Sequence, residues 1–344
     1  MKQPAASPLR SHNNNFDLLR LAGALLVLFS HSYGEMLQRP QEFIDKWTGH
    51  RYALSSFGLM IFFSISGYLV TESLLHSVSI KQYIWKRFLR IYPAYIVITL
   101  LTVFVLGPVF TSFSPAHYFS DQLTWKFLYQ NICLFNSPRK LPGVFNGKSV
   151  NLSAWSLPFE LKLYGMILLF YFLQFFRYRW LQAMVFTAAA CIKIFIPLHL
   201  LREWFPFSFD VWYSLGFFFI AGSTLYVWRD KIALHYMGII VLAFLWLVTG
   251  LLHVMGNVPE SLFFVYTILY LGLKTPVLLK PRADLSYGIY IYGSPVQRII
   301  SWETQSSFPL WKYNLLVVPV TVLMGFLSWH LVEKKALRLK NKVS

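Results

Sequence analysis

The first apolar run of the chain reads FDLLRLAGALLVLFSHSYGEM and extends from Phe16 to Met36. A helix needs about 20 residues to cross the hydrocarbon core of a bilayer, so this run predicts one membrane span. Asp17 and Arg20 lie near its start, and His31 lies near its end. It has no small-residue cleavage site, so we interpret it as a retained helix rather than a secretory signal.

Similar apolar segments follow along the rest of the chain. The composition is 56% hydrophobic and only 13% charged, whereas soluble domains are about 25% charged. These features predict an all-α integral membrane protein with about ten transmembrane helices. The predicted spans are 16–36, 53–75, 91–110, 153–175, 180–200, 209–228, 233–254, 258–279, 284–303 and 313–333. Together they predict one membrane domain at 16–333, with a cytoplasmic N-terminal segment at 1–15 and a basic cytoplasmic tail at 334–344.

The positive charges predict the orientation of these spans. The formal net charge is +17. With the N-terminus inside, the inner segments hold 18 Lys and Arg residues, and the outer segments hold 10. Because Lys and Arg accumulate in cytoplasmic loops, both termini are predicted to be cytoplasmic. The same rule accounts for the net charge without nucleic acid as a partner.

Two further features bear on function. The longest outer loop, about 111–152, is rich in Pro, Asn, Ser and Gly, and a long ordered loop usually has a function. The two cysteines, Cys133 and Cys191, provide neither a disulfide framework nor a zinc-binding spacing. We therefore expect no metal site.

Ionisable residues inside a membrane span are costly and are functional candidates by default. Arg20 and His31 are eleven residues apart. That is close to three helical turns, so both lie on one face, about 16 Å apart along the axis. Asp17 precedes Arg20 by three residues, within pairing range. For this helix alone, the simpler explanation is an interfacial Asp17–Arg20 ion pair with His31 as a helix-packing residue.

Glu160 lies inside the apolar stretch of the fourth predicted span. One explanation is an ion pair that ties helices together, although nearby Lys162 projects from nearly the opposite face. The predicted depths of His31 and Glu160 in the membrane favour a different explanation. His31 lies about 22 Å from the inner boundary and Glu160 about 10 Å from the outer one, in a core roughly 30 Å thick. A carboxylate that holds a histidine tautomer is a common way to build a general base, so we predict a His31–Glu160 pair.

Small residues interrupt the second predicted span in the stretch FFSISGY, from Phe62 to Tyr68. They either permit close helix packing or let a thin ligand pass. The segment that follows carries Arg87 and Arg90, which share a helix face at positions i and i+3. This pair is either ordinary positive-inside charge or a phosphate clamp at the cytoplasmic mouth.

Five short motifs occur in order along the chain. They are Arg20-x10-His31, Phe63-Ser-Ile-Ser-Gly-Tyr68, Arg87-x-x-Arg90-Ile-Tyr-Pro93, Trp155-Ser-Leu-x-x-Glu160 and Ser286-Tyr287-Gly-Ile-Tyr290. Each is weak alone, but together they resemble the bacterial membrane acyltransferase family 3, the O-acetyltransferases of surface polysaccharides. The resemblance runs from Phe16 to about Glu333. One position departs, because the family pattern around Tyr287 often ends in a His where this chain has Gly293.

The resemblance implies a ten-helix enzyme of the bacterial inner membrane. Such enzymes transfer an acyl group, usually acetyl from cytoplasmic acetyl-CoA, onto a sugar hydroxyl. We expect the stand-alone type, with no tightly bound cofactor and with acetyl-CoA as co-substrate. The other expected partners are membrane lipids and a surface glycan or its lipid-linked precursor. O-antigen, capsule, exopolysaccharide, a lipid-linked intermediate and peptidoglycan all remain open as acceptors.

The resemblance and the depth arithmetic together select His31 as the catalytic residue, with Glu160 orienting it or stabilising its charge. His31 would either deprotonate the sugar hydroxyl or take the acyl group itself. The substrate-binding candidates are Arg20, Arg87, Arg90, Ser66, Tyr287 and Trp155, with the arginines placed to meet the phosphates of coenzyme A. A proton-coupled transporter or flippase would use the same buried charges, but we find no internal repeat of the kind many transporters show.

Overall fold

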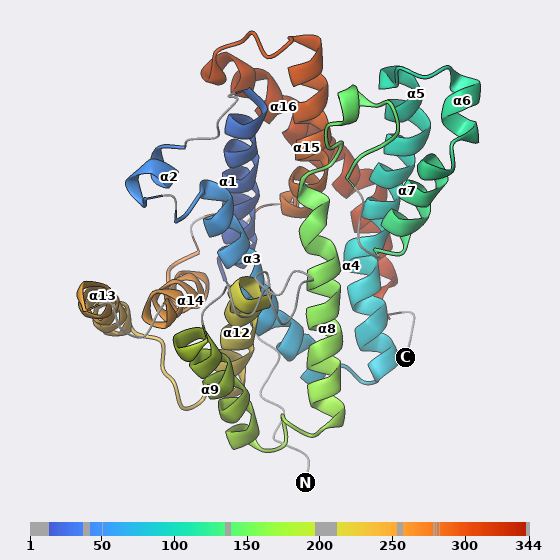
Figure 1. Cartoon of the computed structure of the whole chain (residues 1–344). Helices are drawn as coiled ribbons and strands as arrows, with labels where there is room; N and C mark the ends of the chain where they lie inside the picture. Colours follow the sequence, from blue (N-terminus) through green and yellow to red (C-terminus); the bar gives the residue numbers. More distant parts are fainter. Residues whose placement is uncertain are drawn as a thin grey trace. The chain divides into compact units, whose positions relative to one another are not determined.

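The computed structural model describes residues 14–36, 42–49, 51–134, 139–196, 212–252, 257–277, 279, 281 and 283–341 (Figure 1). Among these residues the chain is helical, and the single β feature is an isolated bridge between Thr111 and Val144. The predicted all-α class is therefore confirmed. Most of the predicted N-terminal segment, residues 1–13, lies outside the described residues, as do the last three residues of the predicted tail.

Each of the ten predicted spans overlaps with a helix. These helices are α1 (Phe16–Met36), α3 (Leu54–Leu75), α4 (Ile80–Leu101), α8 (Leu157–Phe172), α9 (Arg179–Phe195), α12 (Phe217–Val227), α13 (Tyr236–Leu251), α14 (Val258–Leu273), α15 (Ser286–Glu303) and α16 (Leu310–Ser328). In the described part of the chain, four helices are long and apolar enough to cross a membrane: 16–36, 54–75, 80–110 and 310–340. The number ten and the cytoplasmic placing of both termini stay predictions.

The third predicted span starts earlier than its apolar pattern indicates. Helix α4 begins at Ile80, where the Ser79 side chain caps it by accepting a hydrogen bond from the Gln82 backbone N–H at 3.2 Å. It continues through a π-helical turn (Thr102–Leu106) into α5 (Gly107–Phe110). Arg87 and Arg90 therefore lie within the helix, and not in the loop before it.

The chain divides into two compact units, and the boundaries fall inside α1, α3 and α8. The first unit comprises Met1–Arg20, Leu59–Ser77 and Phe159–Pro281, and the second comprises Leu21–Gly58, Val78–Pro158 and Arg282–Ser344. We describe each unit by itself.

In the first unit, α3 packs closely on α12 through small residues. A β-carbon on Gly67 would collide with the Phe219 backbone, and one on Gly222 would collide with the Ser64 carbonyl oxygen. Thr71 donates a hydrogen bond to Ser223 across the same contact at 2.8 Å. The small residues of the FFSISGY stretch thus serve close helix packing, the first of the two roles expected for them.

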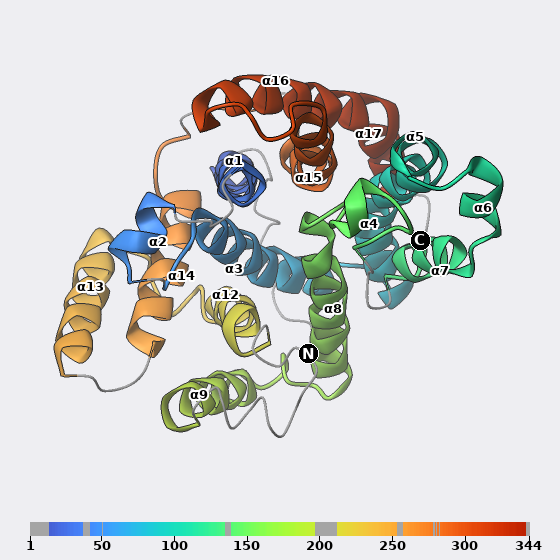
Figure 2. The ribbon, with the colours of Figure 1, turned by 45° about the horizontal axis from the view of Figure 1, so that its top comes forward.

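In the second unit, α1, α15 and α16 lie side by side (Figure 2). Gly288 and Gly325 let α15 and α16 approach, since a β-carbon on Gly288 would be 2.7 Å from the Gly325 Cα. The Gln297 amide on α15 donates to the Leu28 carbonyl at 2.7 Å and to the Ser32 hydroxyl at 2.8 Å, both on α1. These bonds fix the end of α1 that carries His31.

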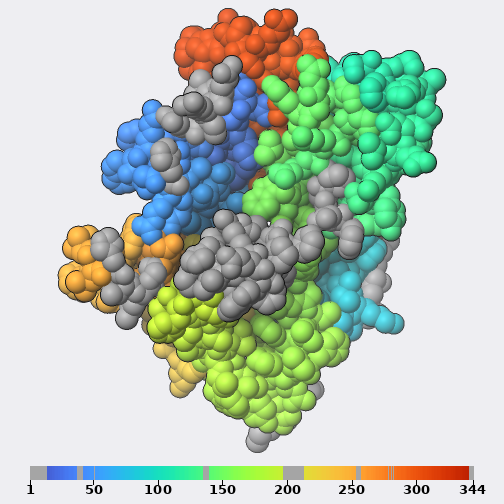
Figure 3. Space-filling model, in the orientation of Figure 1, coloured from blue at the N-terminus to red at the C-terminus, as the bar shows by residue number. Residues whose placement is uncertain are grey.

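The predicted outer loop is a folded segment. It contains α6 (Pro115–Ser120) and α7 (Gln122–Ile132), which appear with α5 as a teal lobe in Figure 3. Its buried core consists of Val103, Tyr118, Phe127, Leu141, Val144, Phe145 and Val150. The Tyr118 hydroxyl donates to the Val103 carbonyl at 3.0 Å, and burial raises the pKa of Tyr118 to about 12, so this phenol stays a neutral donor.

Candidate active site

His31 lines a polar cavity of about 390 Å³ in the second unit. The cavity collects residues from α1, from α15, from the short helix α2 (Phe43–Trp47) and from the residues beside it. Its lining residues are Ser30, His31, Gly34, Glu35, Glu42, Asp45, Ala53, Leu152 and Arg298. One imidazole, three carboxylates and one guanidinium thus share a space of substrate size.

A buried ion pair forms one wall of this cavity. Arg298 Nη1 and Glu35 Oε2 are 2.7 Å apart, and their side chains are 9% and 4% exposed. Arg298 Nε also donates to the Ser149 carbonyl at 2.9 Å. A buried charge must be paired and hydrogen-bonded to be tolerated, and both conditions are met for Arg298. The pair holds the outer segment, α15 and α1 in one arrangement.

Glu42 forms a second fixed point beside His31. One of its carboxylate oxygens accepts a hydrogen bond from the Ser30 hydroxyl, and the other accepts one from the Leu54 backbone N–H at 2.6 Å. Glu42 is only 4% exposed. Its carboxylate therefore links the residue before His31 to the start of α3.

The residues around Trp155 are tied to α15. The Asn151 amide donates to the Ile291 carbonyl at 3.0 Å, and the Leu152 backbone N–H donates to the Ser294 hydroxyl at 2.7 Å. Further along, the hydroxyl groups of Ser156 and Tyr290 are 2.6 Å apart. Trp155 lies between these anchors in a 3-10 turn (Ser153–Ser156) and is half-buried.

A second polar cluster joins two of the sequence motifs in the same unit. Arg90 on α4 forms an ion pair with Asp284 at 2.8 Å, and its guanidinium lies 5.9 Å from the centre of the Tyr287 ring. The Tyr287 hydroxyl donates to the Ile91 carbonyl at 2.8 Å. Glu333 lies beside the start of α15, since a β-carbon on Gly288 would be 3.3 Å from its carboxylate. The structure thus brings Arg90 and Tyr287 together, as a shared site requires.

In the first unit, two other predicted site residues meet. The Ser66 hydroxyl on α3 donates to a Glu160 carboxylate oxygen at 3.3 Å, and Tyr164 also donates to it. Arg20 lies 3.8 Å from Asp17, which is the ion pair expected from their spacing. His31 and Glu160 belong to different units, so their pairing stays a prediction.

The sequence interpretation missed Glu35, Glu42, Asp45 and Arg298. Arg298 was counted among the outer positive charges although it falls inside the predicted span 284–303, where an ionisable residue is a functional candidate. Glu35 lies four residues after His31 on the same helix, in pairing range. Those two signals were present in the sequence. Glu42 and Asp45 lie outside the predicted spans and carried no comparable signal.

Comparisons with known proteins agree with the motif order and with the helical structure. Residues 13–333 match the family described as an acyltransferase domain. The chain belongs to this family, acyltransferase family 3. It is accordingly a multi-pass membrane acyltransferase.

Three known proteins are similar to this acyltransferase over most of its length. An O-acetyl transferase of Shigella phage Sf6 is 29% identical, over 94% of this chain and 96% of the relative. Nodulation protein 10 of Rhizobium leguminosarum is 28% identical, over 99% of this chain and 97% of the relative. The peptidoglycan O-acetyltransferase OatA of Listeria monocytogenes is 24% identical, over 80% of this chain and 50% of OatA. No solved structure matches the chain significantly.

Gly293 is where this acyltransferase departs from the family pattern. A β-carbon at Gly293 would lie 2.8 Å from Leu28 Cδ1 on α1. A histidine there therefore requires the Leu28 side chain to shift. In this chain the position serves the close packing that places His31 against α15.

Proposed function

We propose that this protein is an O-acetyltransferase of the bacterial inner membrane that moves acetyl from cytoplasmic acetyl-CoA onto a glycan hydroxyl. The observation that carries the proposal is the polar cavity around His31, in a chain that belongs to an acyltransferase family. Two of its relatives are named as O-acetyl transferases, one of them acting on peptidoglycan. The acceptor is therefore a surface glycan or its lipid-linked precursor.

His31 acts as the general base in this reaction. The sugar hydroxyl gives its proton to His31 while its oxygen attacks the thioester carbonyl. The new C–O ester bond forms, the C–S bond breaks, and the proton then passes from His31 to the leaving thiolate of coenzyme A. Glu35, Glu42 and Asp45 line the same cavity and favour the positive charge that His31 carries between these events. Glu160 adds to this stabilisation from α8 if the predicted pair forms.

The donor enters from the other end of α15. Tyr287 and Arg298 are eleven residues apart on this helix, so they lie on one face about 16 Å apart along the axis. Arg90 and Tyr287 mark the end proposed to meet the phosphates of coenzyme A, with Arg87 one turn before Arg90. The long, thin pantetheine arm then carries the thioester along α15 toward His31.

The test is acetyl-CoA turnover by the purified protein with a glycan acceptor. His31→Ala should reduce thiol release and ester formation to the background rate, because no base remains to take the hydroxyl proton. His117→Ala is the matched control, since His117 is exposed on α6 and lies outside the cavity. Normal turnover by His31→Ala would remove His31 from the mechanism. Absence of acetyl-CoA consumption by the wild-type protein would favour the transporter reading instead.

A further inference from the structure

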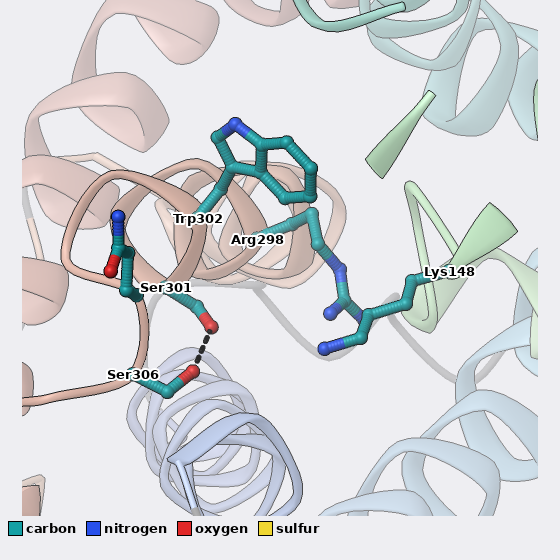
Figure 4. A pocket seen from close by; sticks show the side chains of 6 residues that line it. Lys148, Arg298, Ser301, Trp302 and Ser306 are labelled. Carbon is teal, nitrogen blue, oxygen red and sulfur yellow. Dashed lines mark hydrogen bonds between the residues drawn. The ribbon is translucent and has the colours of Figure 1, made fainter. Parts of the chain in front are cut away.

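A cleft of about 380 Å³ lies next to the His31 cavity in the second unit. Its lining residues are Lys148, Arg298, Ser301, Trp302, Gln305 and Ser306 (Figure 4). Arg298 lines both spaces, so the cleft and the His31 cavity share one wall. The mechanism above uses none of the other five residues.

The cleft offers a platform and hydroxyl partners suited to a sugar. Trp302 is 38% exposed, and the ring of Phe145 meets it at 5.5 Å in an edge contact that holds it in place. An indole face covers apolar area while its edge stays hydrated, which matches the apolar C–H face of a pyranose ring. The hydroxyl groups of Ser301 and Ser306 are 3.0 Å apart at the same site, and Gln305 adds an amide.

The charges of the cleft add a requirement on the charge of its ligand. The Lys148 and Arg298 side chains extend toward the same part of the cleft (Figure 4). Arg298 is compensated by Glu35 at 2.7 Å. Glu35 also interacts electrostatically with the exposed Lys148, although no carboxylate among the described residues lies within salt-bridge distance of it, so one carboxylate faces two cations. The cleft therefore has an excess of one positive charge, and an anionic ligand group removes the repulsion between its two cations.

We propose that this cleft binds the acceptor and that the acceptor sugar carries a negatively charged group, a carboxylate or a phosphate, close to the hydroxyl that receives the acetyl group. Trp302 supports the ring, Lys148 and Arg298 bind the anion, and the hydroxyl projects into the His31 cavity. The inference rests on the proposed function. It narrows the acceptor from any surface glycan to an acidic one.

The experiment compares three soluble acceptors: a disaccharide ending in glucuronic acid, the matching glucose disaccharide, and glucose 6-phosphate. The wild-type protein should use one acidic acceptor with a KM at least about tenfold below that of the neutral disaccharide, because a charge-assisted hydrogen bond to the anion stabilises only the acidic complex. The acidic acceptor with the lower KM identifies the anion as carboxylate or phosphate. Equal KM values for all three acceptors would overturn the proposal.

Two substitutions assign the effect to the cleft. Lys148→Gln should raise the KM of the preferred acidic acceptor about tenfold and leave the KM values of the neutral disaccharide and of acetyl-CoA unchanged. Lys140→Gln is the control, because Lys140 is another exposed lysine of the same outer segment. Trp302→Ala should raise the KM of every acceptor, whereas Trp311→Ala, at a Trp that is 70% exposed and does not line the cleft, should not.

A binding measurement separates this inference from the proposed function. Calorimetry with the glucuronate disaccharide and with glucose 6-phosphate, in the absence of acetyl-CoA, reports on the cleft even if no acetyl transfer is found. Weaker binding of one acidic sugar to Lys148→Gln than to the wild-type protein supports the cleft as an anionic-sugar site. Equal binding by both proteins, or no binding by either, refutes it, whatever the outcome of the turnover assay.

Discussion

Removing one partner of the Arg298–Glu35 pair should destabilise the protein strongly. The two charged atoms are 2.7 Å apart, and both side chains are almost fully buried. Arg298→Met leaves the Glu35 carboxylate buried without its direct partner, with only the exposed Lys148 to offset its charge, which costs about 3–5 kcal/mol. It also removes the donor to the Ser149 carbonyl, which adds about 1 kcal/mol. Glu35→Met leaves the opposite charge uncompensated and should cost a similar amount.

The double variant should be far more stable than the two single losses suggest. With both charges gone, no uncompensated ion remains, and two methionines fill much of the same volume. We expect a loss of about 1–2 kcal/mol for the double variant, against roughly 8–12 kcal/mol for the sum of the single losses. This difference is the coupling free energy of the pair.

The assay is unfolding of the purified protein in a mild detergent, without acceptor or donor. The wild-type protein and the three variants form a double-mutant cycle. Because no substrate is present, the role of Arg298 in the acceptor cleft does not enter the result. A double variant that loses as much as the two single variants together would show that the ion pair does not stabilise this wall of the cavity.

Three other predictions concern the site. Glu160→Gln should keep the fold but lose much activity, and combining it with His31→Ala should cost little beyond His31→Ala alone; losses that multiply in the turnover assay would place Glu160 elsewhere. Arg87→Ala with Arg90→Ala should raise the KM of acetyl-CoA more than that of the acceptor, and an unchanged KM would leave these charges a topological role. Gly293→His should lower the free energy of unfolding by about 1 kcal/mol, because its β-carbon meets the Leu28 side chain of α1 at 2.8 Å; an unchanged unfolding temperature would show that Leu28 moves aside to accept it.

The sequence was sufficient to predict that the helices exist, but not where the helices with charged ends begin. Long apolar segments are a strong signal, and all ten predicted ranges overlap with a helix. The start of α4 was missed because Lys81, Lys86, Arg87 and Arg90 lower the hydropathy of its first turns. The sequence pattern predicts a loop for the outer segment, because α6 and α7 are too short to stand out and turn-forming residues flank them.

The site shows a similar division. Motif order brought out His31, Arg90 and Tyr287, and the structure places the last two in contact distance of each other. Two carboxylates of the His31 cavity, Glu42 and Asp45, could not be assigned in the same way. Glu42 is twelve residues from Ser30 in the sequence, and the fold brings the two side chains together. Its second partner is a backbone group, the Leu54 N–H. Tertiary contacts of that kind leave no periodic pattern in a single sequence.

The core of the outer segment has an evolutionary consequence. Tyr118, Phe127 and Phe145 pack mostly with neighbours from this segment and from the end of the preceding helix, and Phe145 also contacts Trp302 of α15. Lys148 sits on the surface of that segment, while His31 sits on a helix built from different residues. Mutation can therefore change which sugar is selected without rebuilding the reacting centre. A lineage under pressure to alter its acceptor can do so by a few substitutions around the proposed acceptor cleft, with the proposed transfer chemistry inherited intact.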